Sequence, residues 1–392
     1  MRKITIMIML LLLLGFGVGR AEAYAIKGEA YLLFECATGE ILMQKNGSSR
    51  LFPASTTKIL TAVLALEKGD LQEEVVISRQ AMGVIGSKLD LRITEKTSLE
   101  DLLYALLLYS ANDAAVAIAE HISGSVDSFV LLMNDKAKAL GAERSHFTNP
   151  HGLTSNTHYT TAEDLARITA YAMKNEKFRE IVETKEFLFS TSERRIKIEN
   201  RNRLLWSFAE TTGVKTGYTT AARYTLVASA KNGERELIAV ILGSDDERIW
   251  EDAEKLLDYG LYGFKLEEVI SDSESFKINA GWGQNIVAHP EKDVQISLSL
   301  RAEPRIEKIV LPKRLKYPLA EGQVVGELLV RVDETERARV KLLANEAVEK
   351  ESQNYILAVI LIFIFLELKR RKGSNLLYSE NKQGIWRNID EQ

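Results

Sequence analysis

The sequence predicts an α/β (α+β) fold, in which a mixed region at residues 24–263 is followed by a small all-β domain at residues 264–345. The first region mixes helical and strand patterns. From Phe264 onward long helical periods disappear, and Ile296-Ser297-Leu298-Ser299-Leu300 alternates strictly, as a half-buried strand does. A chain of 392 residues is also too long for one ordinary core, so two domains are expected.

The first part of the mixed region carries signals for a hairpin and two helices. A hairpin-like segment runs from Ala30 to Met43, with Thr38-Gly39 at its turn. A helix is expected to begin near Pro53, because proline is favoured in a first turn. Thr97-Ser98 begins a second helix, with a capping-box arrangement to Asp101. Leu102 to Tyr109 is apolar throughout, so we expect this second helix to be buried.

The second part of the mixed region predicts two strands and a helix. The strands are expected at Tyr224–Ala230 and Glu236–Leu242, joined by a turn at Lys231-Asn232-Gly233-Glu234. The helix follows at about Arg248 to Tyr259. In the β-rich domain, Gln323 to Val332 also reads as a strand.

Composition excludes several classes of function. A hydrophobic content of 46% with 27% charged residues is typical of a globular protein. The net charge of −4 argues against a nucleic-acid partner, which needs a basic surface. The single cysteine, Cys36, excludes an intramolecular disulfide and a cysteine-based metal cluster, and its strand-like surroundings predict a buried thiol. The five histidines lack metal-binding spacing, so we expect no metal and no cofactor.

The N-terminus predicts a signal peptide at residues 1–23. Arg2 and Lys3 precede an apolar run from Ile4 to Val18, and small-x-small sites for cleavage after Ala23 or Ala25 follow. An uncleaved anchor is the alternative, but the run is short for a membrane span. The chain is therefore expected to be exported.

The C-terminus carries a second membrane signal. The apolar run from Tyr355 to Leu366 is shorter than the ~20 residues that a span needs, but it is apolar on every face. The basic cluster Lys369-Arg370-Arg371-Lys372 fits the positive-inside rule. We expect a spanning or interfacial anchor at residues 354–368, a tail at residues 369–392, and the body at the outer face of the cytoplasmic membrane. A soluble interaction helix is the alternative.

The first chemical motif is Ser55-Thr56-Thr57-Lys58. A serine hydroxyl is a weak nucleophile until a base takes its proton. Residues three apart lie on one face of a helix, so Lys58 can reach the oxygen of Ser55. Lysine becomes a base when burial or nearby positive charge lowers its pKa. By itself this pattern is weak, since a surface serine and lysine on a helix satisfy it equally well.

Two further motifs follow in the chain. Ser110-Ala111-Asn112 comes just after the apolar helix, where a hydroxyl can relay a proton and an amide can position the lysine or the substrate; helix C-capping is the ordinary explanation. Lys215-Thr216-Gly217 comes before the Tyr224 strand, where Lys215 and Thr216 can bind a carboxylate and Gly217 allows close approach; an ordinary turn is the alternative. The three motifs in this order are typical of penicillin-binding proteins and class A β-lactamases.

On these motifs the chain resembles the D-alanyl-D-alanine carboxypeptidases, which are low-molecular-mass penicillin-binding proteins. The resemblance covers residues 24–345. The matching stretches are Pro53-Ala54-Ser55-Thr56-Thr57-Lys58, Ser110-Ala111-Asn112-Asp113-Ala114, Asn149-Pro150-His151-Gly152-Leu153 and Lys215-Thr216-Gly217-Tyr218-Thr219. The resemblance implies a β-lactamase/transpeptidase-like domain, with a central antiparallel sheet, flanking helices and a helical subdomain. It also implies removal of the terminal D-alanine from peptidoglycan stem pentapeptides, and covalent inhibition by β-lactam antibiotics.

The resemblance also implies roles for individual residues. Ser55 attacks the carbonyl between two D-alanines and Lys58 accepts its proton, while Ser110 and Asn112 relay a proton and position the substrate. Lys215, Thr216 and Gly217 lie along the terminal carboxylate. The oxyanion lies between the backbone N–H groups of Ser55 and Tyr218. Water then hydrolyses the acyl-enzyme.

Two further residues are assigned a place. Arg248 resembles a basic residue of the family that helps to hold the substrate carboxylate. His151 is expected to have a structural place beside the site, because the context of a Ser–His–Asp triad is absent around Ser55.

Three other functions remain open. A class A β-lactamase would need a Glu-x-x-x-Asn pattern, but Glu163 is followed by Arg167. A transpeptidase or endopeptidase on the same scaffold would share the acylation step and differ only in the acceptor. A wall-binding protein with an inactive site would be expected to lack a catalytic residue, and none is missing.

Overall fold

The structure is a computed structural model that describes residues 26–281, 284–349 and 358–371. It forms two compact units. Residues up to Val269 and Gln295–Pro304 form the first, and Ile270–Val294 with the residues from Arg305 onward form the second. The predicted signal peptide lies outside the described residues.

A five-stranded antiparallel sheet forms the centre of the first unit. Its strands follow the order β2-β1-β9-β8-β7. They are β1 (Ala30–Glu35), β2 (Ile41–Lys45), β7 (Thr211–Thr219), β8 (Arg223–Asn232) and β9 (Arg235–Ser244). The predicted hairpin and both predicted strands of the mixed region are confirmed. β7, which carries Lys215, lies at an edge of this sheet.

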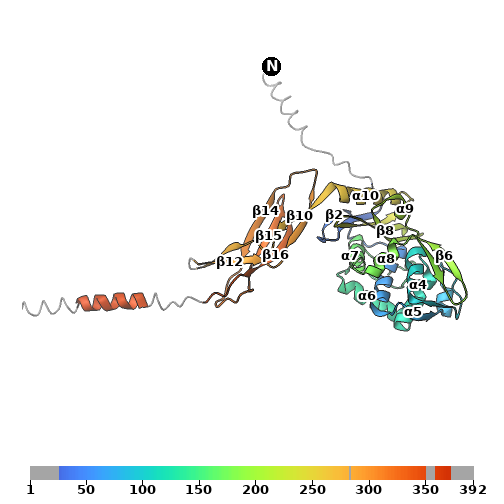
Figure 1. The fold of residues 1–392 in the computed structure, drawn as a ribbon, viewed down its shortest axis with the longest axis horizontal. Helices are drawn as coiled ribbons and strands as arrows, with labels where there is room; N and C mark the ends of the chain where they lie inside the picture. Colours follow the sequence, from blue (N-terminus) through green and yellow to red (C-terminus); the bar gives the residue numbers. More distant parts are fainter. Residues whose placement is uncertain (1–25, 282–283, 350–357, 372–392) are drawn as a thin grey trace, which may run out of the picture. The chain divides into compact units, whose positions relative to one another are not determined.

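Helices cover both faces of the sheet. α10 (Ile249–Gly263) packs on one face against Leu237, Ala239 and Ile241 of β9. The remaining helical body packs on the other face, against Ile238, Val240 and Leu242. Burial on both faces explains why β9 reads as a continuous apolar run. In Figure 1, α10 lies on one side of β8 and α5, α6, α7 and α8 on the other.

The helical body consists of short helices. They are η1 (Ala54–Thr57), α2 (Lys58–Lys68), α3 (Arg79–Gly83), α4 (Leu99–Tyr104), η2 (Ala105–Tyr109), α5 (Asn112–Ser123), α6 (Val126–Ala139), α7 (Ala162–Ala172) and α8 (Glu176–Glu183). The short helix α9 (Leu204–Ser207) instead packs on the α10 side, through Leu204. Two small hairpins accompany the helical body, β3 (Glu74–Val76) with β4 (Lys96–Ser98) and β5 (Glu186–Ser190) with β6 (Arg195–Glu199).

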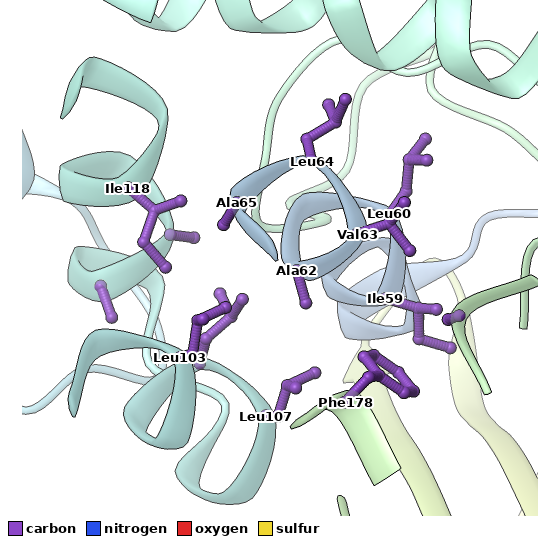
Figure 2. Close-up of a cluster of buried hydrophobic side chains, with 14 of the residues drawn as sticks. Ile59, Leu60, Ala62, Val63, Leu64, Ala65, Leu103, Leu107, Ile118 and Phe178 are labelled. Carbon is purple, nitrogen blue, oxygen red and sulfur yellow. The ribbon is translucent and has the colours of Figure 1, made fainter. Parts of the chain in front are cut away.

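α2 lies in the middle of the helical body. Its residues 58–65 are all buried. Figure 2 shows its apolar side chains surrounded by Leu103 and Leu107, Ile118 of α5 and Phe178 of α8. A helix that is packed on every side has no freedom to shift. The turn that precedes α2 is therefore held in a fixed position.

The predicted buried helix is present but is not regular. Ser98 caps α4 by accepting the backbone N–H of Asp101 at 3.0 Å, as the capping pattern predicted. The chain then widens into the π-helical turn η2 and ends at Ser110, which has a left-handed backbone with φ of 68°. Widened turns of this kind often occur at functional sites. The sequence pattern had predicted one uniform helix.

The first unit continues past residue 263. β10 (Phe264–Ile270) pairs with β13 (Val294–Ser299). The guanidinium of Arg235 donates to the carbonyl of Phe264 at 2.6 Å, and the backbone N–H of Ser297 donates to Glu40 at 2.7 Å. These contacts attach both strands to the five-stranded sheet of the first unit.

The second unit is a five-stranded antiparallel sheet, as predicted for the β-rich domain. Its order is β11-β12-β16-β15-β14. The strands are β11 (Phe276–Gly281), β12 (Gln284–Pro290), β14 (Ile306–Pro312), β15 (Val324–Val332) and β16 (Thr335–Ala344).

The predicted anchor at residues 354–368 falls partly on described residues. Residues 358–371 are helical and exposed. Within the described ranges no single helix has both the length and the apolar character to cross a membrane, although α5 and α6 together pass such a test across an 86° bend. Residues 354–357 of the predicted anchor and residues 372–392 of the predicted tail lie outside the described part of the chain.

Candidate active site

Ser55 and Lys58 come together at the start of α2. Ser55 lies in η1, and the Nζ of Lys58, the first residue of α2, is 2.9 Å from its Oγ. The carbonyl of Pro53 accepts the hydroxyl of Thr56 at 2.7 Å and that of Thr225 at 3.0 Å. The second bond ties the turn to β8. The predicted Ser–Lys pair is thus formed and fixed to the sheet.

Lys58 lies in a buried polar pocket. Besides Ser55, its Nζ contacts the Oδ1 of Asn112 and the carbonyl of His151, both at 2.7 Å. Burial, followed by the positive charges of Lys215 and Arg201, holds the pKa of Lys58 well below its usual range. These are the two causes that lower a lysine pKa. In its neutral form the amine can accept the proton of Ser55.

The second motif lies against this lysine. Ser110 is buried at the end of η2, and Asn112 begins α5. The Nδ2 of Asn112 donates to the carbonyl of Ile85 at 2.7 Å, which leaves its Oδ1 facing Lys58. Ser110 does end a helix, as the capping explanation requires, but Asn112 is also brought into contact with Lys58.

The third motif borders the turn at residues 53–57, which carries Ser55 and is called the nucleophile turn from here on. A Cβ placed on Gly217 would lie 2.7 Å from the backbone nitrogen of Ser55 and 2.5 Å from the Oγ1 of Thr225. Only glycine fits such a close approach. Thr216 and Gly217 are half-buried, and the side chain of Tyr218 is exposed and packs on the ring of Tyr224 with centroids 4.8 Å apart.

Lys215 is the second buried lysine of the site. Its Nζ donates to the carbonyl of Thr216 at 3.0 Å. Burial, followed by the positive charge of Arg201, lowers the pKa of Lys215 to about 7. A carboxylate that approached it would favour the charged form. Lys215 is thus suited to bind an anionic group.

The loop at residues 149–153 forms another side of the turn. Gly152 has φ of +89°, and a Cβ there would lie 1.8 Å from the carbonyl oxygen of Ala54. The side chain of His151 is half-buried, and its removal from water, followed by the charge of Lys58, lowers its pKa to about 3. Its Nδ1 accepts the backbone N–H of Leu153 at 3.2 Å. This bond agrees with the structural place expected for the His151 ring.

Two residues near the site were not found from the sequence. The guanidinium of Arg201 lies 4.4 Å from the ring centre of Tyr109, and its charge lowers the pKa of both lysines. The Nε2 of buried His158 is 2.9 Å from the Oγ1 of Thr57, inside the nucleophile turn. Neither lies in a motif, because each acts through a contact with a residue more than 90 positions away.

Arg248 immediately precedes α10. Its exposed guanidinium pairs with Asp246, with Nε 2.8 Å from Oδ2. A role in substrate binding stays a prediction. Within the described residues, no group of three or more histidine, cysteine or acidic side chains could hold a metal ion.

The fold and the Ser–Lys site define a serine acyl-transfer enzyme of the penicillin-binding type. Residues 18–246 match the D-alanyl-D-alanine carboxypeptidase family, and residues 264–350 match the family described as penicillin-binding protein 5, C-terminal domain. The chain belongs to the D-alanyl-D-alanine carboxypeptidase family and is a serine-type hydrolase of that kind.

Curated relatives and solved structures agree with this assignment. The chain is 32% identical over 344 residues to D-alanyl-D-alanine carboxypeptidase DacF of Bacillus subtilis. The aligned residues make up 84% of this chain and 88% of the relative. It is 31% identical to the structure of penicillin binding protein 5 from Haemophilus influenzae, with a TM-score of 0.74, covering 85% and 100% of the two chains. The Streptomyces K15 DD-transpeptidase, 32% identical, has a TM-score of 0.59 and covers 60% of this chain and 98% of its own.

Proposed function

We propose that this protein removes the terminal D-alanine from peptidoglycan stem pentapeptides through an acyl-enzyme on Ser55. The observation that carries the proposal is the buried contact of Lys58 with Ser55. A neutral Lys58 takes the hydroxyl proton while Oγ attacks the carbonyl between the two D-alanines. The peptide bond breaks and free D-alanine leaves, its amine receiving a proton by way of Ser110.

The remaining groups of the site stabilise and orient the substrate in this proposal. The oxyanion lies between the backbone N–H groups of Ser55 and Tyr218, and such donors act most strongly where water is excluded. The terminal carboxylate lies along Lys215, Thr216 and Gly217, with Arg248 as a further candidate. Water then cleaves the ester, which releases the shortened peptide and restores Ser55.

Two alternatives use the same acylation step. The similarity to the Streptomyces K15 DD-transpeptidase favours a capacity for transfer to an amine in place of water. The β-lactamase alternative has less support, because Glu163 in α7 lies 3.7 Å from the guanidinium of Arg144 and is followed by Arg167. β-Lactams should therefore act as long-lived covalent inhibitors.

We further propose that the protein works at the outer face of the cytoplasmic membrane. The predicted signal peptide supports export. The described helix at residues 358–371 carries a continuous run of exposed apolar side chains from Val359 to Leu366, which supports attachment at the membrane surface. Truncation before residue 354 should move the protein from the membrane fraction to the soluble fraction; unchanged membrane association would contradict the anchor.

The function is tested on the full chain with a peptide that ends in D-Ala-D-Ala. The wild type should release D-alanine, and a labelled penicillin should mark Ser55. Ser55→Ala should abolish both. Release at the wild-type rate by Ser55→Ala, or none by the wild type, would overturn the proposal. Adding an amine acceptor to the same assay separates hydrolysis from transfer.

A further inference from the structure

A loop beside the catalytic lysine is fixed in place although it lies outside any helix or strand. We call residues 84–91 the strap. Asn112 holds it at two points, since Nδ2 donates to the carbonyl of Ile85 and the backbone N–H donates to the carbonyl of Ser87, both at 2.7 Å. A glycine at position 86 permits this approach, because a Cβ there would lie 2.8 Å from that Nδ2.

The next residue of α5 fixes the other end of the strap. The buried carboxylate of Asp113 accepts the backbone N–H groups of Leu89 at 3.0 Å and Leu91 at 3.1 Å. Arg194 adds a bond from its guanidinium to the carbonyl of Asp90 at 2.7 Å. Buried polar groups are satisfied in this way only where the surrounding geometry is fixed. The strap is therefore rigid.

This rigid strap presents an apolar side chain to solvent. The side chain of Ile85 is 71% exposed, and that of Met82, three residues earlier in α3, is 38% exposed. A single exposed isoleucine is ordinary on a protein surface. Ile85 differs because its own carbonyl is bonded to Asn112, whose other side contacts Lys58. A single side chain, that of Asn112, therefore connects the backbone of Ile85 to the catalytic lysine.

We propose that the strap is a specificity wall on which Ile85 binds the aliphatic side chain of the residue that precedes D-Ala-D-Ala in the substrate. This inference rests on the proposed function and on the substrate-positioning role that the family resemblance implies for Asn112. In a substrate peptide that lies along Asn112, the side chain that precedes D-Ala-D-Ala then lies beside Ile85, whose carbonyl is bonded to the side-chain amide of Asn112. An apolar surface selects a long aliphatic side chain over glycine by burying methylene groups.

The test compares two peptides on the full chain. One carries a diacetylated lysine before D-Ala-D-Ala and the other carries glycine. The wild type should have a higher kcat/KM for the lysine peptide. Ile85→Ser should lower the ratio of the two values about fourfold, the effect of burying one methylene group, while D-alanine release from the glycine peptide stays unchanged.

The matched control is Leu131→Ser, which removes a leucine of α6 that is 68% exposed and lies outside the strap. Its ratio should equal that of the wild type. Equal ratios in the wild type and Ile85→Ser would overturn the proposed role of the strap and leave the proposed function standing. A wild type that released D-alanine from neither peptide would overturn the proposed function and the wall together.

Discussion

The Nζ of Lys58 and the Oδ1 of Asn112 are 2.7 Å apart, and this contact joins two motifs that are 54 positions apart in the chain. The side-chain amide of Asn112 has a hydrogen-bond partner on each side. It accepts from the lysine on one side and donates to the carbonyl of Ile85 on the other, so its orientation is set. A neutral partner at this place leaves the pKa of Lys58 low, whereas a carboxylate would raise it.

Asn112→Asp should therefore weaken acylation most at low pH. The new carboxylate favours the ammonium form of Lys58, so a higher pH is needed to obtain the free amine. We expect the rate of acylation by penicillin to fall at neutral pH by at least tenfold and its acidic limb to move to higher pH. Rates measured across pH 5–10 check this. An acidic limb at the wild-type position would contradict the electrostatic role of Asn112.

Lys58→Ala should abolish acylation while the fold remains. General-base catalysis contributes about 10²- to 10⁴-fold in rate, and no other neutral amine contacts Ser55 in the described site. The measurements are the mass of the penicillin adduct and the far-ultraviolet circular dichroism spectrum. Acylation at the wild-type rate would reject Lys58 as the base. A lost spectrum would instead identify Lys58 as a residue required for folding.

Arg201→Gln should shift the pH profile of the enzyme upward. The charge of Arg201 lowers the pKa of both Lys58 and Lys215, and removal of a positive charge makes both lysines easier to protonate. The acidic limb then moves to higher pH, because Lys58 must be neutral. The alkaline limb also moves to higher pH, because Lys215 must be charged. The profile of kcat/KM against pH is the measurement.

The control for this prediction is Arg203→Gln. Arg203 is an exposed arginine whose guanidinium lies 5.9 Å from the ring of Trp250 and pairs with Glu247. It contributes to the pKa of neither catalytic lysine. A profile shifted equally in both variants would mean that Arg201 has no specific electrostatic role.

Individual strands, helices and motifs could be predicted from local patterns, whereas the central antiparallel sheet and the roles of the site residues were implied by the resemblance to a family. Strand alternation, the capping of α4 by Ser98 and the spacing of Ser55 and Lys58 all act within a few residues. Arg201 and His158 escaped prediction because they act through tertiary contacts. The widened turn before Ser110 was missed for a related reason, since an apolar run has the same sequence in a regular helix and in an irregular one.

The start predicted for the β-rich domain, Phe264, is also where the match to the penicillin-binding protein 5 C-terminal domain begins. The contact of Arg235 with the carbonyl of Phe264, which joins the start of β10 to the first compact unit, was not predicted, because a side-chain contact over 29 positions leaves no periodic signal.

Gly152→Ala should damage the site more than its backbone conformation alone explains. Gly152 has φ of +89°, where a Cβ is strained, and a Cβ there would also lie 1.8 Å from the carbonyl oxygen of Ala54. Gly124 supplies the matched control, because it has φ of +75° with nothing within 4 Å of an added Cβ. Gly124→Ala should cost about 1–2 kcal/mol of unfolding free energy and leave acylation unchanged.

Gly152→Ala should cost at least about 2 kcal/mol more than that control, because the clash displaces the backbone beside the nucleophile. The same displacement moves the backbone nitrogen of Ser55 away from its position beside Gly217, so acylation by penicillin should slow at least tenfold in the folded protein. Denaturant unfolding and acylation rates for the two variants measure both effects. Equal losses of stability in the two variants, with acylation intact in each, would show that the loop at residues 149–153 does not support the nucleophile turn.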